Sequence, residues 1–275
     1  MARLLRRLLK NAFAWLISII VLIPFAVMLV NSLKTKEESY SMTLKLPAVM
    51  QLQNYLTVIE QGNIIASFFN SFMYATICVV LVVLTCSMAA FVISRNETGF
   101  NKFVYLLIIT GIVLPVNYVA LMKVMQVTLL NDTRLGISLL YAAMNIPISL
   151  FISTGFIHSI PRELDEAAII DGCGPWNLFF RVIFPLLKPI AVTVGVLAFM
   201  AAWNDFMMPL YYLNTSEKWP MSLSVYSFFG ASMQAQRQWN LVCADIVLTS
   251  VPVIVVYLLG QRYIVSGITA GAVKG

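Results

Sequence analysis

The side chains of this chain that could do chemistry are concentrated in one polar stretch, where Glu163, Asp165, Glu166 and Asp171 interrupt an otherwise apolar sequence. Carboxylates in the first turns of a helix are stabilised by the helix dipole and can pair with basic groups of a partner. The sequence has no Gly-x-x-x-x-Gly-Lys-Ser/Thr loop, no His-Glu metal helix and no nucleophile elbow. We therefore predict recognition of another protein, with no catalytic residue and no metal site.

Two short amphipathic helices joined at a glycine are predicted to carry these acids. Gly172 follows the first periodic run as a helix stop, and Gly174-Pro175 can begin a second helix. Residues at i, i+3, i+4 and i+7 of the second helix predict one aromatic face, made by Trp176, Phe179, Phe180 and Ile183. Any side chain at Gly172 is expected to crowd the turn, and a positive φ there costs a β-branched residue roughly 1 kcal/mol or more. The hairpin either docks on another protein or lies on the membrane surface.

Composition places the chain in a membrane. Hydrophobic residues make up 60% of it and charged residues 11%, and the mean hydropathy is +0.86. A soluble enzyme is disfavoured because several nearly uncharged runs reach the roughly 20 residues that a helix needs to cross a bilayer. We predict one all-α transmembrane domain over residues 1–275, with a hairpin at 158–188 between the fourth and fifth of six spans. The spans are expected at residues 12–33, 68–94, 103–127, 136–157, 189–213 and 241–263.

Charges that flank the spans predict the orientation. Placing the N-terminus in the cytoplasm puts the larger share of the 18 lysines and arginines on that side, as the positive-inside rule requires. Both termini and the hairpin are then cytoplasmic. Because this pattern accounts for the net charge of +6, we expect no nucleic-acid partner. The 4 cysteines show no CxxC pairing, so we expect them to be small buried hydrophobes.

The hairpin sequence resembles a known motif. Glu166-Ala167-Ala168, Gly172 and Val182-Ile183-Phe184-Pro185 have the order and spacing of the EAA loop of ABC-importer permease subunits. The resemblance continues through Trp203-Asn204-Asp205-Phe206 to the C-terminal residues 267–275, so it covers most of the chain from about the third span onward. The chain is similar to the sugar-importer branch, in particular to the smaller permease of maltose-type systems and to multiple-sugar and raffinose-like permeases.

This resemblance implies a type I importer permease fold in the bacterial cell membrane, without catalytic activity of its own. No cofactor is expected in this chain, because ATP and Mg belong to partner ATPase subunits. The implied partners are a second homologous permease, two ATP-binding subunits, an extracytoplasmic sugar-binding protein and membrane lipid. The implied substrate is a carbohydrate, in particular an oligosaccharide. The residues implied in coupling to the ATPase are Glu163, Glu166, Ala167, Ala168, Asp171, Gly172, Trp176, Phe179 and Pro185.

A second set of residues could line a polar path for the sugar. Sugars have polar rims and apolar faces, so amides and carboxylates beside aromatic rings suit them. The candidates, near the fifth span and near prolines of the third and fourth, are Asn117, Tyr118, Asn145, Trp203, Asn204, Asp205 and Tyr211. Acids inside a membrane usually face a cavity or a partner. For Asp205, and for Asp245 in the sixth span, the alternative is a structural hydrogen bond to a neighbouring helix.

The C-terminal segment 264–275 is small and rich in glycine, and we expect it to be a strand-like tail. The resemblance implies that it inserts between the ATPase subunits, with Gly271, Lys274 and Gly275 as contacts. The alternative is a frayed terminus.

Two other functions stay open at this point. A stand-alone secondary carrier would use Asp205 or Asp245 as a proton site, but it leaves the hairpin and the tail unexplained. An ABC importer of another polar solute, such as glycerol phosphate, would favour basic residues in the path. Only Lys123 is available there, so a neutral sugar is preferred.

Overall fold

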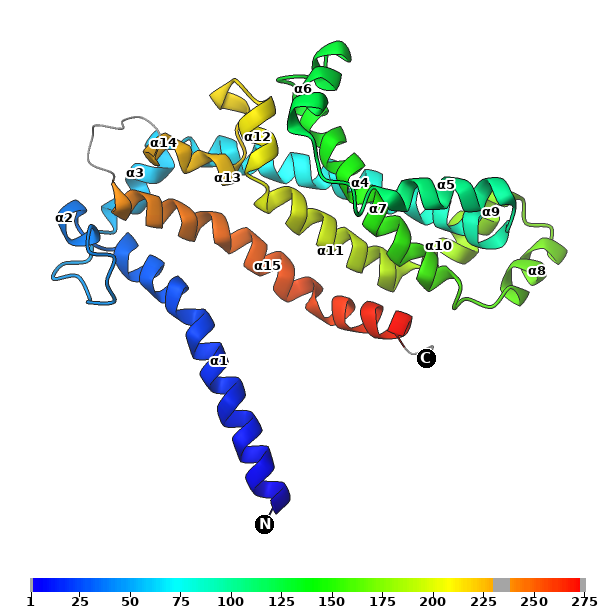
Figure 1. The fold of residues 1–275 in the computed structure, drawn as a ribbon, viewed down its shortest axis with the longest axis horizontal. Helices are drawn as coiled ribbons and strands as arrows, with labels where there is room; N and C mark the ends of the chain where they lie inside the picture. Colours follow the sequence, from blue (N-terminus) through cyan, green and yellow to red (C-terminus); the bar gives the residue numbers. More distant parts are fainter. Residues whose placement is uncertain (1, 230–237, 273–275) are drawn as a thin grey trace. The chain divides into compact units, whose positions relative to one another are not determined.

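The computed structural model describes the backbone of residues 2–229 and 238–272 and the side chains of residues 9–228 and 238–261. These residues form helices and loops without a strand, which confirms the all-α prediction (Figure 1). Four helices are long and apolar enough to cross a membrane, or five if one bent pair counts as a span. The number of six spans therefore stays a prediction. The chain divides into two compact units, Met1–Ile65 with Ser224–Val251 and Ala66–Leu223 with Pro252–Gly275.

The first unit contains α1 (Ala2–Ser32), α2 (Lys36–Ser39), α3 (Gln53–Gln61), α14 (Tyr226–Phe229) and the first part of α15 (Trp239–Ala272). The apolar window of α1 buries 0% of its residues within the chain. A membrane-length helix with no intramolecular cover is left to lipid or to another protein.

Buried polar groups join the loops of this first unit. Lys34 is 2% exposed, and its Nζ donates to Asn31 Oδ1 at 2.9 Å and to the Thr43 carbonyl at 2.7 Å. Asn54 Nδ2 donates to the carbonyls of Ser32 and Lys34 at 2.8 and 2.9 Å, and Asn240 Nδ2 donates to Asn54 Oδ1 at 2.8 Å. These bonds satisfy groups that would otherwise be costly to bury.

The second unit holds the spans that carry the hairpin. Its helices before the hairpin are α4 (Ile64–Arg95), α5 (Gly99–Thr110), α6 (Tyr118–Val127) and α7 (Arg134–Ile157). The helices that follow are α11 (Lys188–Asn204), α12 (Met207–Tyr212), a 3-10 turn (Ser216–Lys218) and α13 (Met221–Ser224). In this unit α7 packs against both α5 and α11, and its neighbours can be followed in Figure 1.

Two of the predicted spans are not single helices. The segment 103–127 divides into α5 and α6, because the chain leaves the helix at Gly111 and Pro115 has no N–H to continue it. The segment 189–213 divides at Asp205, whose extended backbone separates α11 from α12. Whether each of these two segments crosses the membrane stays a prediction.

The last helix is longer than the sequence suggested. We expected a span that ends near residue 263 and a strand-like tail after it, but α15 continues to Ala272. The tail is therefore helical as far as Ala272, which includes Gly271. Lys274 and Gly275 lie outside the described residues.

Candidate functional site

The predicted hairpin is present and begins with α8 (Glu163–Ile170). Glu163, Glu166 and Asp171 are exposed at its surface. Within the part of the chain that the structure describes, their side chains have no ion-pair partner. Ala168 is buried under the helix and Ala167 is exposed. The first arm thus presents unpaired acids beside a side chain small enough for close approach.

Gly172 makes the turn between the two arms. Its φ is +82°, a conformation that favours glycine. Its N–H donates to the Ile169 carbonyl at 2.9 Å, and the Cys173 N–H donates to the Ala168 carbonyl at 3.0 Å. These are the two hydrogen bonds of a Schellman motif, so the predicted helix stop is confirmed. The expected crowding is wrong, because no heavy atom of the described residues beyond Asp171, Gly172 and Cys173 lies within 4 Å of a Cβ placed on Gly172.

The second arm is not a uniform α-helix. It consists of α9 (Pro175–Asn177), a π-helix (Leu178–Ile183) and α10 (Phe184–Leu186). A π-helix bonds i to i+5, so side chains spaced for 3.6 residues per turn no longer share one face. The predicted single aromatic face is therefore wrong. Leu178, Phe179 and Ile183 are buried, whereas Trp176 and Phe180 are exposed and stack with ring centroids 6.1 Å apart.

A buried ion pair ties the first arm to the end of α4. Arg95 Nε lies 2.5 Å from Asp165 Oδ2, and Arg95 Nη2 donates to Asp165 Oδ1 at 3.3 Å and to the Ile160 carbonyl at 3.2 Å. Both side chains are 12% exposed. An ion pair that is this well shielded from water is expected to hold its geometry.

The second arm also contacts α4. Phe91, one turn before Arg95, lies 5.7 Å from Phe179 between ring centroids, and Phe179 is 4% exposed. An exposed pair, Arg162 with Glu97 at 2.6 Å, adds a contact at the loop after α4. The last turns of α4 therefore hold both arms of the hairpin.

The tip of the hairpin is apolar and uncovered. Ile170 is 85% exposed, Trp176 is 66% exposed and Ile169 is 59% exposed. Pro185, at the end of the second arm, is exposed as well. The hairpin is fixed to α4 at its root, which we define as the Arg95–Asp165 pair, and it carries apolar side chains at its tip with unpaired acids beside them. This is the composition of a protein-docking surface.

The structure separates the predicted path residues into three places. Trp203 is fully buried and packs on Phe199 and Phe68 at centroid distances of 5.3 and 5.8 Å. Tyr118 and Tyr211 come together at 5.0 Å between ring centroids, with Asn117 capping α6 beside them. Asn204 follows Trp203 in the chain and is exposed at the end of α11. Trp203 thus has the surroundings of a core residue.

Asp205 and Asn145 belong to the third place. Asp205 Oδ2 accepts the Met208 N–H at 3.1 Å, which caps α12, and the carboxylate interacts with Tyr141. Asn145 donates to the Tyr141 carbonyl at 2.8 Å, so Tyr141 links the two candidates. In the first unit, Asp245 is 1% exposed and accepts the Ser224 hydroxyl at 2.8 Å. The contacts of Asp205 and Asp245 therefore agree with the alternative interpretation, in which each acid makes a structural hydrogen bond.

A polar cluster at Asp132, between α6 and α7, was not among the predicted sites. Asp132 Oδ2 accepts the Thr215 hydroxyl at 2.7 Å and Lys218 Nζ at 2.9 Å, and Oδ1 accepts the Asn214 N–H at 3.0 Å. Partial burial raises the pKa of Asp132, but the hydrogen bonds from Thr215, Lys218 and Asn214 outweigh it and lower this pKa to about 2. The cluster fixes the loop after α12.

Arg95 and Asp165 were also missed as a functional pair. The sequence offers one signal, since Arg95 is a cation at the end of an apolar run, but Asp165 is not set apart there from the other acids of the hairpin. Nothing in the sequence relates two residues 70 positions apart.

Together, the membrane-length apolar helices and the exposed hairpin are typical of a membrane protein with a surface that another protein could contact. The family described as binding-protein-dependent transport system inner membrane component matches residues 82–270, and the chain belongs to this family. The expected resemblance to importer permeases is thereby confirmed.

Two relatives cover nearly the whole chain. The chain is 32% identical over 259 residues, 94% of its length and 93% of the relative's, to the probable starch degradation products transport system permease protein AmyC of Thermoanaerobacterium thermosulfurigenes. It is 33% identical over 257 residues, 92% of its length and 91% of the relative's, to the melibiose/raffinose/stachyose import permease protein MelC of Bacillus subtilis.

A solved structure has the same fold. A chain of a bacterial ABC transporter involved in the import of the acidic polysaccharide alginate aligns with a TM-score of 0.80 at 22% identity, over 94% of this chain and 96% of that chain. This match supports the type I importer permease fold.

Proposed function

We propose that this chain is a permease subunit of an ATP-driven importer for a neutral oligosaccharide. The observation that carries the proposal is the hairpin, in which a Gly172 turn presents an exposed apolar tip while a buried ion pair holds the root on α4. In a member of this transport family, such an element can serve as the docking site through which an ATPase subunit moves the spans.

Coupling follows from the contacts of the hairpin. An ATPase that grips Ile169, Ile170 and Trp176 displaces the hairpin, and the Arg95–Asp165 pair passes that displacement to α4. The exposed Glu166 and Asp171 meet basic groups of the ATPase. ATP and Mg are held by the ATPase, so this chain does no chemistry itself.

The proposed assembly contains this chain, a second permease, two ATPase subunits and an extracytoplasmic sugar-binding protein. The hairpin and both termini lie in the cytoplasm of a bacterial cell, as the distribution of basic residues favours. Gly271, Lys274 and Gly275 add a contact to the ATPases at the end of the chain. In this orientation the Asp132 cluster lies on the extracytoplasmic side of the membrane. Its loop, fixed by hydrogen bonds, is proposed to contact the binding protein.

A saccharide is the substrate class that the relatives support, because AmyC and MelC carry the names of starch products and of melibiose, raffinose and stachyose. Tyr118 and Tyr211, paired at 5.0 Å beside Asn117, form a cluster of rings and an amide that suits a sugar. A proton-driven carrier is not supported, since Asp205 and Asp245 are engaged in helix capping and in a buried hydrogen bond.

Gly172→Val tests the coupling role. A valine at a φ of +82° strains the turn by roughly 1 kcal/mol or more and should tilt the tip away from its partner. We expect membrane insertion to be unchanged, sugar uptake to fall at least tenfold and the ATPase to be lost during purification.

Gly174→Val is the matched control. Gly174 lies two residues further on, its φ is −70° and its Cβ position is open, so valine fits there without strain. Uptake by this variant should stay within twofold of the wild type. Normal uptake by Gly172→Val would contradict the proposal.

A further inference from the structure

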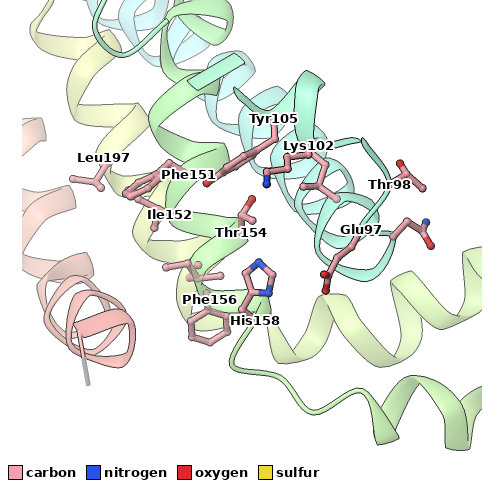
Figure 2. Close-up of a pocket in the computed structure, with 14 residues that line it drawn as sticks. Glu97, Thr98, Lys102, Tyr105, Phe151, Ile152, Thr154, Phe156, His158 and Leu197 are labelled. Carbon is pink, nitrogen blue, oxygen red and sulfur yellow. The ribbon is translucent and has the colours of Figure 1, made fainter. Parts of the chain in front are cut away.

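A cavity of about 760 Å³ lies in the second unit, beside the root of the hairpin (Figure 2). Its walls come from the end of α4, from α5, from the last two turns of α7 and from α11. The proposed coupling mechanism makes no use of it. Its size is in the range of ligand sites.

Polarity changes from one side of this cavity to the other. Phe151, Ile152 and Leu197 form an apolar side, and Phe151 remains 52% exposed. Lys102 and His158 lie near the ends of their helices, where a membrane helix meets the headgroup region. Figure 2 shows the Lys102 ammonium group pointing toward Thr154.

The polar side of the cavity is cationic. Glu97 is its only lining carboxylate among the described residues, and it pairs with Arg162 at 2.6 Å. Lys102 therefore has no carboxylate partner in the part of the chain that the structure describes. A free ammonium group and an imidazole that line one space can together bind a phosphate.

We propose that this cavity binds an anionic phospholipid, with its phosphate at Lys102 and His158 and an acyl chain against Phe151, Ile152 and Leu197. The occupant must be apolar within the span and anionic at the helix ends, and basic pockets between membrane helices on the cytoplasmic side are known to hold acidic headgroups. The bilayer supplies such a molecule directly.

Occupancy would strengthen the root of the hairpin. A phosphate between Lys102 on α5 and His158, the C-cap of α7, joins two elements that flank the chain leading to Arg162. The consequence for transport rests on the proposed function, whereas the binding itself does not. Binding and transport are therefore measured separately.

The test uses the complete transporter, delipidated and returned to nanodiscs. Bound lipid is counted by native mass spectrometry with phosphatidylglycerol, with phosphatidylcholine of the same acyl chains, or with inorganic phosphate alone. We expect phosphatidylglycerol to be retained preferentially, and Lys102→Gln to weaken its binding about fivefold, since one basic residue near an anionic membrane contributes about that factor. Lys188→Gln is the control, because Lys188 is exposed at the start of α11 and does not line the cavity.

A second measurement identifies the occupied space. Gly155 lines the cavity and has room for a Cβ, so Gly155→Cys, in a Cys173→Ser background, gives an apolar maleimide a target. Phosphatidylglycerol should slow this labelling. Three results would each overturn the proposal. They are equal retention of both lipids, equal loss of lipid binding in Lys102→Gln and Lys188→Gln, and protection of Gly155→Cys from labelling by the partner permease without lipid. Protection by inorganic phosphate alone would show a simple anion site instead.

Discussion

The hairpin and the Asp132 cluster are both polar elements at the ends of spans, but they use their polar groups in opposite ways. Asp132 accepts hydrogen bonds from Asn214, Thr215 and Lys218, so its carboxylate is satisfied within the chain. The hairpin pairs Asp165 with Arg95 at its root, whereas Glu163, Glu166 and Asp171 have no ion-pair partner among the described residues and the apolar tip stays exposed.

This difference indicates that the hairpin, and not the Asp132 cluster, is the element on which a partner protein exerts force. A loop whose carboxylate is held by three neighbouring residues can present a surface, but these hydrogen bonds oppose its movement. A hairpin that is fixed at the root and bare at the tip can receive a force and pass it inward. Four predictions can break or sharpen this comparison, from the largest effect to the smallest.

Removing one member of the Arg95–Asp165 pair should have the largest effect on transport, because it disturbs both the coupling contact and the fold. Asp165→Ala leaves a guanidinium group buried without its partner, which costs about 3–5 kcal/mol for a fully buried pair and somewhat less at 12% exposure. Uptake and thermal stability should both fall. The swap Arg95→Asp with Asp165→Arg should recover part of both, and Glu97→Gln, in the exposed pair, should change stability by less than about 1 kcal/mol.

The tip and the core of the second arm should respond differently to truncation. Phe179→Ala removes a buried ring and should destabilise the protein by about 3–5 kcal/mol in a thermal or denaturant assay. Trp176→Ala removes an exposed ring, so stability should stay within about 0.5 kcal/mol while co-purification of the ATPase falls. Loss of stability in Trp176→Ala with normal ATPase retention would show that the tip is structural.

Asp205 should tolerate an amide better than an apolar side chain. Asp205→Asn can still accept the Met208 N–H and should keep substantial uptake, whereas Asp205→Leu loses the cap, at about 1 kcal/mol. Uptake and melting temperature are measured for both. If Asn is as inactive as Leu, the negative charge itself is required and a proton-linked role regains support.

The Asp132 cluster should contribute stability that depends on pH. Its pKa in the folded protein is about 2, below the ordinary value of 3.8, so the contribution is present above pH 4 and is lost as the pH falls toward 2. The difference in melting temperature between the wild type and Asp132→Asn should therefore shrink over this range. A constant difference would show that the charge of Asp132 does not stabilise the loop.

Much of the hairpin could be read from the sequence because its signals are local. Gly172 after a periodic run predicts a helix stop, and the spacing from Glu166 to Pro185 carries the family resemblance. The π-helix at Leu178–Ile183 was missed, since the same residues also fit a 3.6-residue period. Only packing against Phe91 on α4 distinguishes the buried Phe179 from the exposed Trp176.

The sequence by itself determined the membrane character, the all-α class, the place of the hairpin and the family, since each follows from composition or from short-range spacing. The tertiary structure decided which groups become partners: Asp165 with Arg95, Asp132 with Lys218 and Asp205 with the start of α12. Each carboxylate is chemically the same in the sequence. Its role is set by the groups that folding brings within hydrogen-bond distance, and those groups come from elements far apart along the chain or from helix ends that local spacing did not predict.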